Sequence, residues 1–391
     1  MVAGSSEGLI MPRYVAGTAP DLAISISPGN VFEFAIRGAL VNLDQFESTT
    51  YNGTEVKGFY ELWEESYYDA AFVPYLYKGN YYGFPETQTW SALFYRTDIF
   101  ENLGLEPPDT WEDVYNILPT LTNNGYDFCY NYAVGGYTPF LYQYGGDFYD
   151  ANGMTSGLNT EAAYEAFMEY ANLYLQYNFV YAANFYMRFK SGEMPVGIAD
   201  LTFYQQLNYS APELNGKWAM LPVPGHKRVI DGEEVVDRSM SGLGTCCIII
   251  NKDNVAEENR HYEESWAFLQ WWLSDSVQAE YGREVEATFG VASRWNPANK
   301  NAAQTLPYTQ DELDVINAQW EWLKESPNAM GGYYTSRYLL TALNQTVIQG
   351  LSGRIALEDA VKEINKEMRR KQSEFGIPED GSVLYAERID E

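Results

Sequence analysis

The stretch GFPETQTWSALFYRTDIFENLGLEPPDTWEDV, residues 83–114, joins parts of very different character. Its polar segment PETQTW runs directly into SALFYR, residues 91–96, which is apolar enough to form a central strand. A short helix signal, a double proline and a second helix start follow within a few residues. We interpret this order as a crossing point between two lobes, with the polar loop facing a ligand.

Local signals on both sides of this stretch predict alternating strands and helices. Gly104 suits the left-handed residue after a helix, and Pro107 and Pro108 prevent that helix from continuing. Thr110 and Asp113 form a capping box that opens the next helix. Further strands are predicted over residues 19–27, 194–200 and 244–251, and further helices over residues 161–178 and 263–282 and around an apolar stripe at 357–368. This alternation is typical of a doubly wound α/β protein.

Length and composition narrow the class of protein. A chain of 391 residues exceeds one common domain, so two lobes are expected. The formal net charge of −29 argues against a nucleic acid or an anionic membrane surface as the partner. Tyr, Phe and Trp make up 16% of the chain, and such rings suit the apolar faces of sugars. For any single ring, packing in the core remains the simpler interpretation.

The residues that carry common enzyme and metal chemistry lack the required patterns. Cys129, Cys246 and Cys247 form no CxxC pair, and His226 and His261 do not have metal-ligand spacing. The chain contains no GxSxG elbow, P-loop or GxGxxG motif. We therefore predict no disulfide framework, no metal and no cofactor, and a protein that is not an enzyme.

Several segments together resemble a known family, the extracellular solute-binding proteins of family 1. These are the sugar-binding components of bacterial ABC importers, similar to maltose-binding protein. The segments that carry the resemblance are GTAPDLA (17–23), residues 81–114, FKSGEMPVGIAD (189–200), residues 265–282 with ATFGVASR (287–294), and residues 346–368. They lie in the family's order and span most of the chain.

The resemblance implies a two-lobed α/β fold with a hinge and a central cleft. It places the crossings near Thr97, after residues 244–251 and within residues 299–307. Lobe one would then comprise residues 1–97 and 248–303, and lobe two residues 98–247 and 304–391. The family opens with a strand, a helix and a second strand before GTAPD, whereas only about sixteen residues precede it here. We expect residues upstream of Met1 to supply these elements and an export signal.

The candidate ligand-binding positions follow from the resemblance and from the rule that ligands bind beyond the carboxyl ends of strands in open α/β sheets. Carboxylates and amides there can pair with sugar hydroxyls, and aromatic rings can stack on sugar faces. The candidates are Ser27, Asn30, Glu86, Thr87, Gln88, Trp90, Tyr137, Asp147, Asp200, Phe203, Tyr204, Gly242, Thr245, Tyr334 and Arg337.

Several of these residues have an equally simple structural interpretation. Asp200 could cap the helix that follows it, and Asp147 could belong to a hairpin turn. A calcium site at Asp147 is disfavoured because the acidic spacing lacks the later Glu of an EF-hand loop. Arg337 could pair with one of the many acids, and Tyr137 could be a core ring. Trp90 closes the polar loop just before the strand, where we expect its ring to stack on a sugar.

The resemblance implies reversible capture of an extracellular carbohydrate, an oligosaccharide, by hinge closure and its delivery to an ABC transporter permease. The protein would be a monomer anchored at the outer face of the cell membrane. One alternative is a glycoside-acting enzyme that uses paired carboxylates such as Glu86 and Asp200. Another is a sugar sensor for a membrane kinase, which would use the same closing cleft. Peptide and polyamine ligands are further alternatives.

Overall fold

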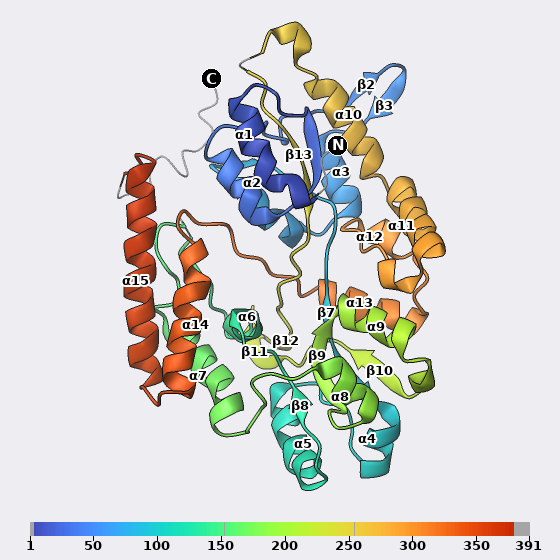
Figure 1. The fold of residues 1–391 in the computed structure, drawn as a ribbon, viewed down its shortest axis with the longest axis vertical. Helices are drawn as coiled ribbons and strands as arrows, with labels where there is room; N and C mark the ends of the chain where they lie inside the picture. Colours follow the sequence, from blue (N-terminus) through green and yellow to red (C-terminus); the bar gives the residue numbers. More distant parts are fainter. Residues whose placement is uncertain (1–3, 152, 254, 379–391) are drawn as a thin grey trace.

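The computed structural model describes residues 4–151, 153–253 and 255–378, which form an upper and a lower lobe joined by extended segments (Figure 1). Each lobe is built around its own sheet, with helices packed against it. Within these ranges, no helix combines the length and the apolar character needed to cross a membrane.

The upper lobe is built on a three-stranded antiparallel sheet. Its order is β1 (Leu22–Ile26), β13 (Cys246–Ile249) and β6 (Phe84–Pro85). Cys247 and Ile249 of β13 pack in one hydrophobic cluster, whereas Cys246 and Ile248 pack in another. Such a continuous apolar run suits a strand that is covered on both faces, so the predicted buried strand is confirmed.

Helices and two hairpins surround this sheet and extend along one side of the molecule. They are α1 (Ile10–Val15), α2 (Pro28–Ala35), α3 (Phe59–Ser66), α10 (Tyr262–Trp272), α11 (Asp275–Phe289), α12 (Lys300–Ala303), the hairpin of β2 (Thr49–Tyr51) and β3 (Thr54–Val56), and the hairpin of β4 (Leu76–Tyr77) and β5 (Asn80–Tyr81).

The lower lobe contains a four-stranded mixed sheet. Its order is β10 (Trp218–Leu221), β7 (Ser91–Arg96), β9 (Val196–Asp200) and β8 (Phe128–Cys129), with β8 and β9 parallel and the other pairs antiparallel. Its other elements are α4 (Thr97–Leu103), α5 (Trp111–Asn123), α6 (Val134–Gln143), α7 (Glu161–Leu175), α8 (Phe185–Ser191), α9 (Leu201–Ser210), α13 (Gln310–Trp320), α14 (Tyr333–Val347), α15 (Gly353–Glu374), and the hairpin of β11 (His226–Ile230) and β12 (Glu233–Asp237).

The positions of β7 and β13 correct the predicted lobe boundaries. β7 pairs with both β9 and β10, so residues 91–96 belong to the sheet of the lower lobe and not to a first lobe ending at residue 97. The pairing of Cys246 with Ile26 places the start of β13 in the upper sheet before residue 248. Both crossings come earlier than predicted. The polar segment before β7 and the one before β13 each pass between the lobes, so the chain has already changed lobe where each strand begins. A third passage runs through α12, because Ala298 packs in an upper cluster just before this helix and Ala303, its last residue, packs in a lower one.

Two of the predicted helix ends are confirmed, at Gly104 and at Thr110. Gly104 ends α4 with φ of 64°, in the left-handed region where glycine lacks the steric penalty of a side chain. The Thr110 hydroxyl accepts a hydrogen bond from the Asp113 N–H at 3.2 Å, and the Asp113 carboxylate accepts one from the Thr110 N–H at 2.9 Å. This is the predicted capping box, and it fixes the start of α5.

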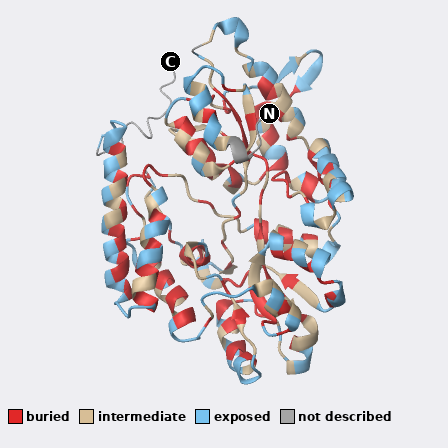
Figure 2. Cartoon of the chain, in the orientation of Figure 1, coloured by how far each residue is buried: buried red, intermediate tan, exposed pale blue. Residues whose placement is uncertain are grey.

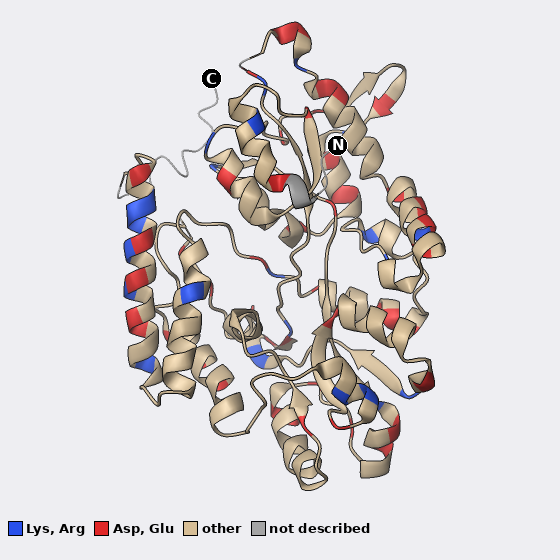
Figure 3. Ribbon diagram, in the orientation of Figure 1, with Lys and Arg blue, Asp and Glu red and all other residues tan. Residues whose placement is uncertain are grey.

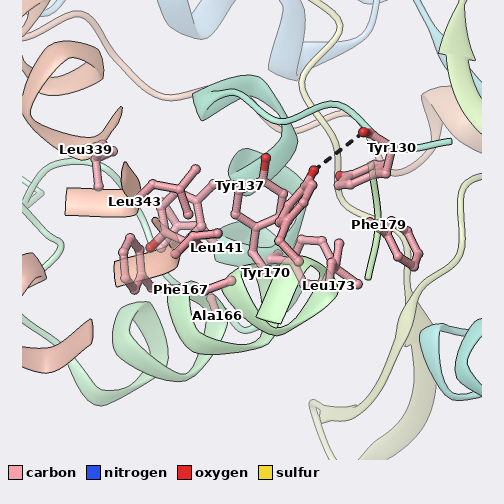
Figure 4. Packing of buried hydrophobic residues seen from close by; sticks show 14 of the residues in the cluster. Tyr130, Tyr137, Leu141, Ala166, Phe167, Tyr170, Leu173, Phe179, Leu339 and Leu343 are labelled. Carbon is pink, nitrogen blue, oxygen red and sulfur yellow. Dashed lines mark hydrogen bonds between the residues drawn. The ribbon is translucent and has the colours of Figure 1, made fainter. Parts of the chain in front are cut away.

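The lower lobe holds the largest hydrophobic cluster, which is rich in aromatic rings (Figure 4). Tyr137 of α6 lies there beside Phe167 and Tyr170 of α7, and all three are buried. The predicted apolar stripe of α15 lies on its buried side, at Leu357, Ala360, Val361, Ile364 and Met368. Across the molecule, buried residues concentrate where the helices face other elements (Figure 2).

Candidate ligand-binding cleft

A cavity of about 530 Å³ lies where the two lobes meet. Pro28, Gly29 and Pro74 line it from the upper lobe, and the start of α6 lines it from the lower lobe. Further parts of the wall come from Thr89, Met240, Ser241 and Leu243, in two segments that connect the lobes, and from Glu325, Ser326 and Asn328, in the segment between α13 and α14. Movement of one lobe against the other would therefore change the shape of this cavity.

The start of α6 offers backbone donors to this cavity. Val134 and Gly135 line it, and the N-cap residue Ala133 makes no side-chain capping hydrogen bond. The first turn of a helix leaves N–H groups without helical partners, and these carry partial positive charge. Gly135 adds no side chain, so an oxygen-rich ligand could approach the backbone closely.

Among the described residues that line the cavity, Glu325 provides the one acidic side chain. The side chain is buried, and its carboxylate accepts hydrogen bonds from the Gly242 N–H at 2.7 Å and the Ser241 hydroxyl at 2.8 Å. Burial raises the pKa of Glu325 to about 7, although these two donors partly oppose the rise. Glu325 is not among the residues predicted from the sequence, because nothing in the pattern KESPN shows that this segment faces the upper lobe.

Polar and aromatic groups beside Glu325 complete this wall. The Tyr142 hydroxyl lies 3.0 Å from the Ser326 hydroxyl. The Lys324 ammonium lies 4.9 Å from the centroid of the Tyr142 ring and donates to the Gly146 carbonyl at 3.1 Å. Lys324 also pairs with the exposed carboxylate of Asp147 at 3.2 Å. The predicted residue Asp147 thus lies next to the cleft, where an ion pair holds it.

A second cavity of about 630 Å³ opens at the carboxyl ends of β8 and β9. Tyr132 and Tyr181 lie on its wall with ring centroids 5.1 Å apart. Phe185 stacks on the predicted residue Phe203 at 4.4 Å. Tyr132 is only two residues before Val134, so one short segment borders both cavities. The lower-lobe walls of the two cavities together carry aromatic rings and polar groups.

Asp200, another predicted residue, lies on the rim of this second cavity. Its carboxylate accepts a hydrogen bond from the Thr202 N–H at 2.9 Å and caps α9, so the capping interpretation is confirmed. The residue remains exposed, so ligand binding by Asp200 is still a prediction.

Glu86 and its neighbours form a structural brace instead of the predicted ligand-facing loop. Glu86 is 1% exposed and accepts hydrogen bonds from the Ser25 N–H at 2.7 Å and the Trp272 indole N–H at 2.8 Å. Ser25 has φ of 58° at a bulge in β1, and the bond to Glu86 holds this unfavourable backbone in place. Thr245 donates to Glu86 at 3.3 Å and lies 2.9 Å from the Thr87 hydroxyl. Glu86 is buried in this brace, whereas Asp200 is exposed on the rim of the second cavity. A paired role of the two carboxylates in hydrolysis therefore has no support.

The loop residues Gln88 and Gly242 are also tightly enclosed. Gln88 is 4% exposed, and its backbone N–H donates to the Asn296 carbonyl at 3.0 Å. A Cβ at Gly242 would lie only 2.5 Å from the Thr89 carbonyl oxygen, so glycine is required where these two connecting segments touch. We interpret both residues as positioning the connecting segments.

Three predicted ligand-facing rings belong to the core, which corrects their assignment. Trp90 is 2% exposed and packs with Phe94 and Tyr204 in a hydrophobic cluster of the lower lobe. The Tyr204 hydroxyl accepts a hydrogen bond from Arg294 at 2.9 Å. The buried Tyr137 hydroxyl donates to the Ala163 carbonyl at 3.0 Å. The Tyr204 and Tyr137 hydroxyls thus find partners within the protein. The buried Trp90 indole N–H has no hydrogen-bond partner among the described residues, so the burial of its ring is what assigns it to the core.

The other predicted residues lie at the edges of the interlobe cavity. Ser27 and Asn30 flank its lining residues Pro28 and Gly29, but the Glu7 carboxylate accepts hydrogen bonds from both. On the opposite side, Tyr334 and the exposed Arg337 flank a lining residue at the start of α14, Ser336. Ligand contacts from Tyr334 and Arg337 remain predictions. The described residues contain no group of three or more His, Cys, Asp or Glu side chains that could hold a metal ion.

Sequence comparisons add an independent line of information. A family model described as "Bacterial extracellular solute-binding protein" matches residues 13–279. A binding protein of Brucella abortus (strain 2308) is 25% identical over 315 residues, which cover 77% of this chain and 67% of that protein. An arabinooligosaccharide-binding protein of Halalkalibacterium halodurans is 21% identical over 282 residues, which cover 65% of this chain and 60% of that protein.

The fold is also similar to solved structures. The sugar-binding protein MalE from Xanthomonas citri matches with a TM-score of 0.73 at 16% identity, covering 96% of this chain and 90% of that one. At this identity the likeness shows the fold alone. The predicted two-lobed α/β fold with a central cleft is therefore confirmed.

Proposed function

Because the chain belongs to the bacterial extracellular solute-binding protein family, we propose that it captures an oligosaccharide between its lobes and delivers it to the membrane permease of an ABC importer. The family is one of binding proteins, which confirms the prediction that the chain is not an enzyme. The observation that carries the proposal is the interlobe cavity and its aromatic neighbour on the lower lobe.

The chemistry of the two cavities supports a carbohydrate ligand. Tyr132, Tyr181 and Phe185 offer apolar faces, while Ser241 and Asn328 offer polar groups for hydroxyls. Two adjoining cavities suit a chain of several sugar units better than a single sugar. Two similar proteins described above, the arabinooligosaccharide-binding protein and the sugar-binding protein MalE, support the same ligand class.

The proposed place of action is the outer face of the cell membrane. The family is extracellular. Acidic residues are spread over outer helices such as α11 and α15 (Figure 3). We propose a monomer that is anchored to the membrane and has no nucleic-acid partner. Sensing by a membrane kinase stays a second candidate, since the same closed cleft could report sugar occupancy.

The ligand class can be tested by thermal melting with tetrasaccharides. At a concentration 100 times Kd, arabinotetraose or maltotetraose should stabilise the protein by about 2.7 kcal/mol, whereas spermidine and a tetrapeptide should not. A blocking variant, Gly135→Leu, should raise Kd at least about tenfold. The melting temperature of the unliganded protein should change little. A Cβ at Gly135 meets no atom within 4 Å, so the leucine would project into the cavity without strain.

An equivalent change at the exposed Gly8, where a Cβ also meets no atom within 4 Å, provides the matched control and should leave binding unchanged. Stabilisation by the peptide or by spermidine, but by no sugar, would reject the proposal. Chromatography of the incubated sugar should show no shorter products, and their appearance would favour the glycoside-acting alternative.

Closure of the lobes gives a second prediction. A sugar that contacts both lobes binds the closed arrangement more tightly than the open one. It therefore shifts the population toward the closed arrangement. We therefore expect small-angle X-ray scattering to show a smaller radius of gyration at saturation with the tetrasaccharide that binds. The Gly135→Leu variant with the same sugar is the control. An unchanged scattering profile, with saturation verified by calorimetry, would contradict hinge closure.

A further inference from the structure

Among the described residues, Glu325 is a buried acid that lines the interlobe cavity, and no cation there lies within ion-pair distance of it. A carboxylate can accept about four hydrogen bonds, whereas the donors bound to Glu325 are the Gly242 N–H and the Ser241 hydroxyl. Both donors come from one connecting segment. The side of the carboxylate toward the cavity therefore retains acceptor capacity.

The charged and titratable groups near Glu325 do not neutralise it. Tyr75 of the upper lobe and Tyr142 of the lower lobe lie near it. Burial raises the pKa of each, and the negative charge of Glu325 adds to the rise. Lys324, the nearest cation along the chain, is held by Asp147 and the Gly146 carbonyl. An ionised Glu325 thus gives the cavity a negative wall that a hydrogen-bond donor on a ligand can complement.

We propose that Glu325 determines ligand specificity by accepting a hydroxyl hydrogen bond from an uncharged sugar and by excluding sugars that carry a carboxylate. This inference rests on the proposed function, since it assigns the charge class of the same ligand. A neutral hydroxyl supplies the missing donor, whereas a uronic acid brings a second negative charge close to a carboxylate that is buried and therefore weakly screened by water.

The direction of the pH dependence follows from this hydrogen bond. The ionised carboxylate accepts this hydrogen bond more strongly than the protonated acid does, so sugar binding favours ionised Glu325. Because the pKa of Glu325 is about 7, most of the free protein has this group protonated at pH 5.5. Affinity should therefore rise with pH, by between about tenfold and thirtyfold from pH 5.5 to 8.5.

The test uses the tetrasaccharide that stabilises the protein most in the melting experiment, and the same sugar oxidised to a carboxylate at its terminal C6. Calorimetry at pH 5.5, 7.0 and 8.5 gives Kd for the wild type and for Glu325→Gln. We expect the wild type to bind the oxidised sugar at least about tenfold more weakly at pH 8.5. In Glu325→Gln, binding of the neutral sugar should vary less than about twofold with pH, and the discrimination should shrink several-fold.

Glu321→Gln is the matched control, because it removes an equal charge from an exposed position in the same segment and should behave like the wild type. The melting temperature of Glu325→Gln establishes that the variant is folded. If Glu325→Gln keeps both the pH dependence and the discrimination, this inference is overturned while carbohydrate binding stands. If no sugar binds the wild type, the proposed function and this inference fail together.

Discussion

Replacing Trp90 with alanine should lower the free energy of unfolding by about 3–5 kcal/mol, the usual cost of removing a large buried aromatic side chain. Trp90 is 2% exposed, and its ring lies 6.4 Å from that of Phe94 and 5.8 Å from that of Tyr204. The truncated side chain would leave a void among these rings. Thermal melting should show a decrease of roughly 5–10 °C.

The matched control is Trp271→Ala, since Trp271 is 53% exposed and should cost well under about 1 kcal/mol. The sugar affinity of folded Trp90→Ala should stay within about threefold of the wild type, because the ring does not border either cavity. A variant with an unchanged melting temperature and a large loss of affinity would instead place this ring against the ligand.

The alternation of side chains along β7 explains why the sequence was misleading at Trp90. Trp90, Ala92 and Phe94 share one side of the chain and pack in one cluster, whereas Leu93 packs in another on the opposite side. The sequence predicts a buried strand here correctly. It does not show which lobe supplies the neighbouring strands, and β9 and β10 come from more than 100 residues further along the chain.

The acidic residues show the same division between what sequence can and cannot predict. Local signals such as the Thr110 capping box depend on residues three positions apart, so they can be predicted from the sequence. The roles of Glu86 and Glu325 depend on partners such as Trp272 and Gly242, which are distant in the sequence. Glu86, which lies in the polar loop PETQTW and was therefore predicted to bind ligand, is a buried brace. Glu325, which no sequence pattern singles out, faces the cavity.

Replacing Arg294 with alanine should also lower the free energy of unfolding by about 3–5 kcal/mol, because it would leave a partly buried carboxylate without its partner. The Arg294 guanidinium donates to both carboxylate oxygens of Glu286, at 2.7 and 2.6 Å, and to the Tyr204 hydroxyl at 2.9 Å. It also lies 4.5 Å from the centroid of the Tyr308 ring. This one side chain therefore connects α11, α9 and the segment before α13.

Arg354→Ala is a closely matched control for this substitution. Arg354 also pairs with a carboxylate, Glu161 at 2.7 Å, and also lies over a tyrosine ring, Tyr164 at 3.8 Å from the centroid. Its side chain is 47% exposed, compared with 5% for Arg294, so water already solvates the charges. We expect Arg354→Ala to cost no more than about 1 kcal/mol in chemical denaturation.

The double variant Arg294→Ala/Glu286→Ala separates the loss of the ion pair from the loss of packing. If the unpaired carboxylate causes much of the damage, removing Glu286 as well should restore part of the stability, and the two changes should be non-additive by at least about 1 kcal/mol. Strict additivity, or equal costs for Arg294→Ala and Arg354→Ala, would contradict a buried ion pair. Because Arg294 joins α11 to α9 at one edge of the molecule, its loss should also loosen the contact between these helices, which hydrogen exchange would detect as faster exchange in α9.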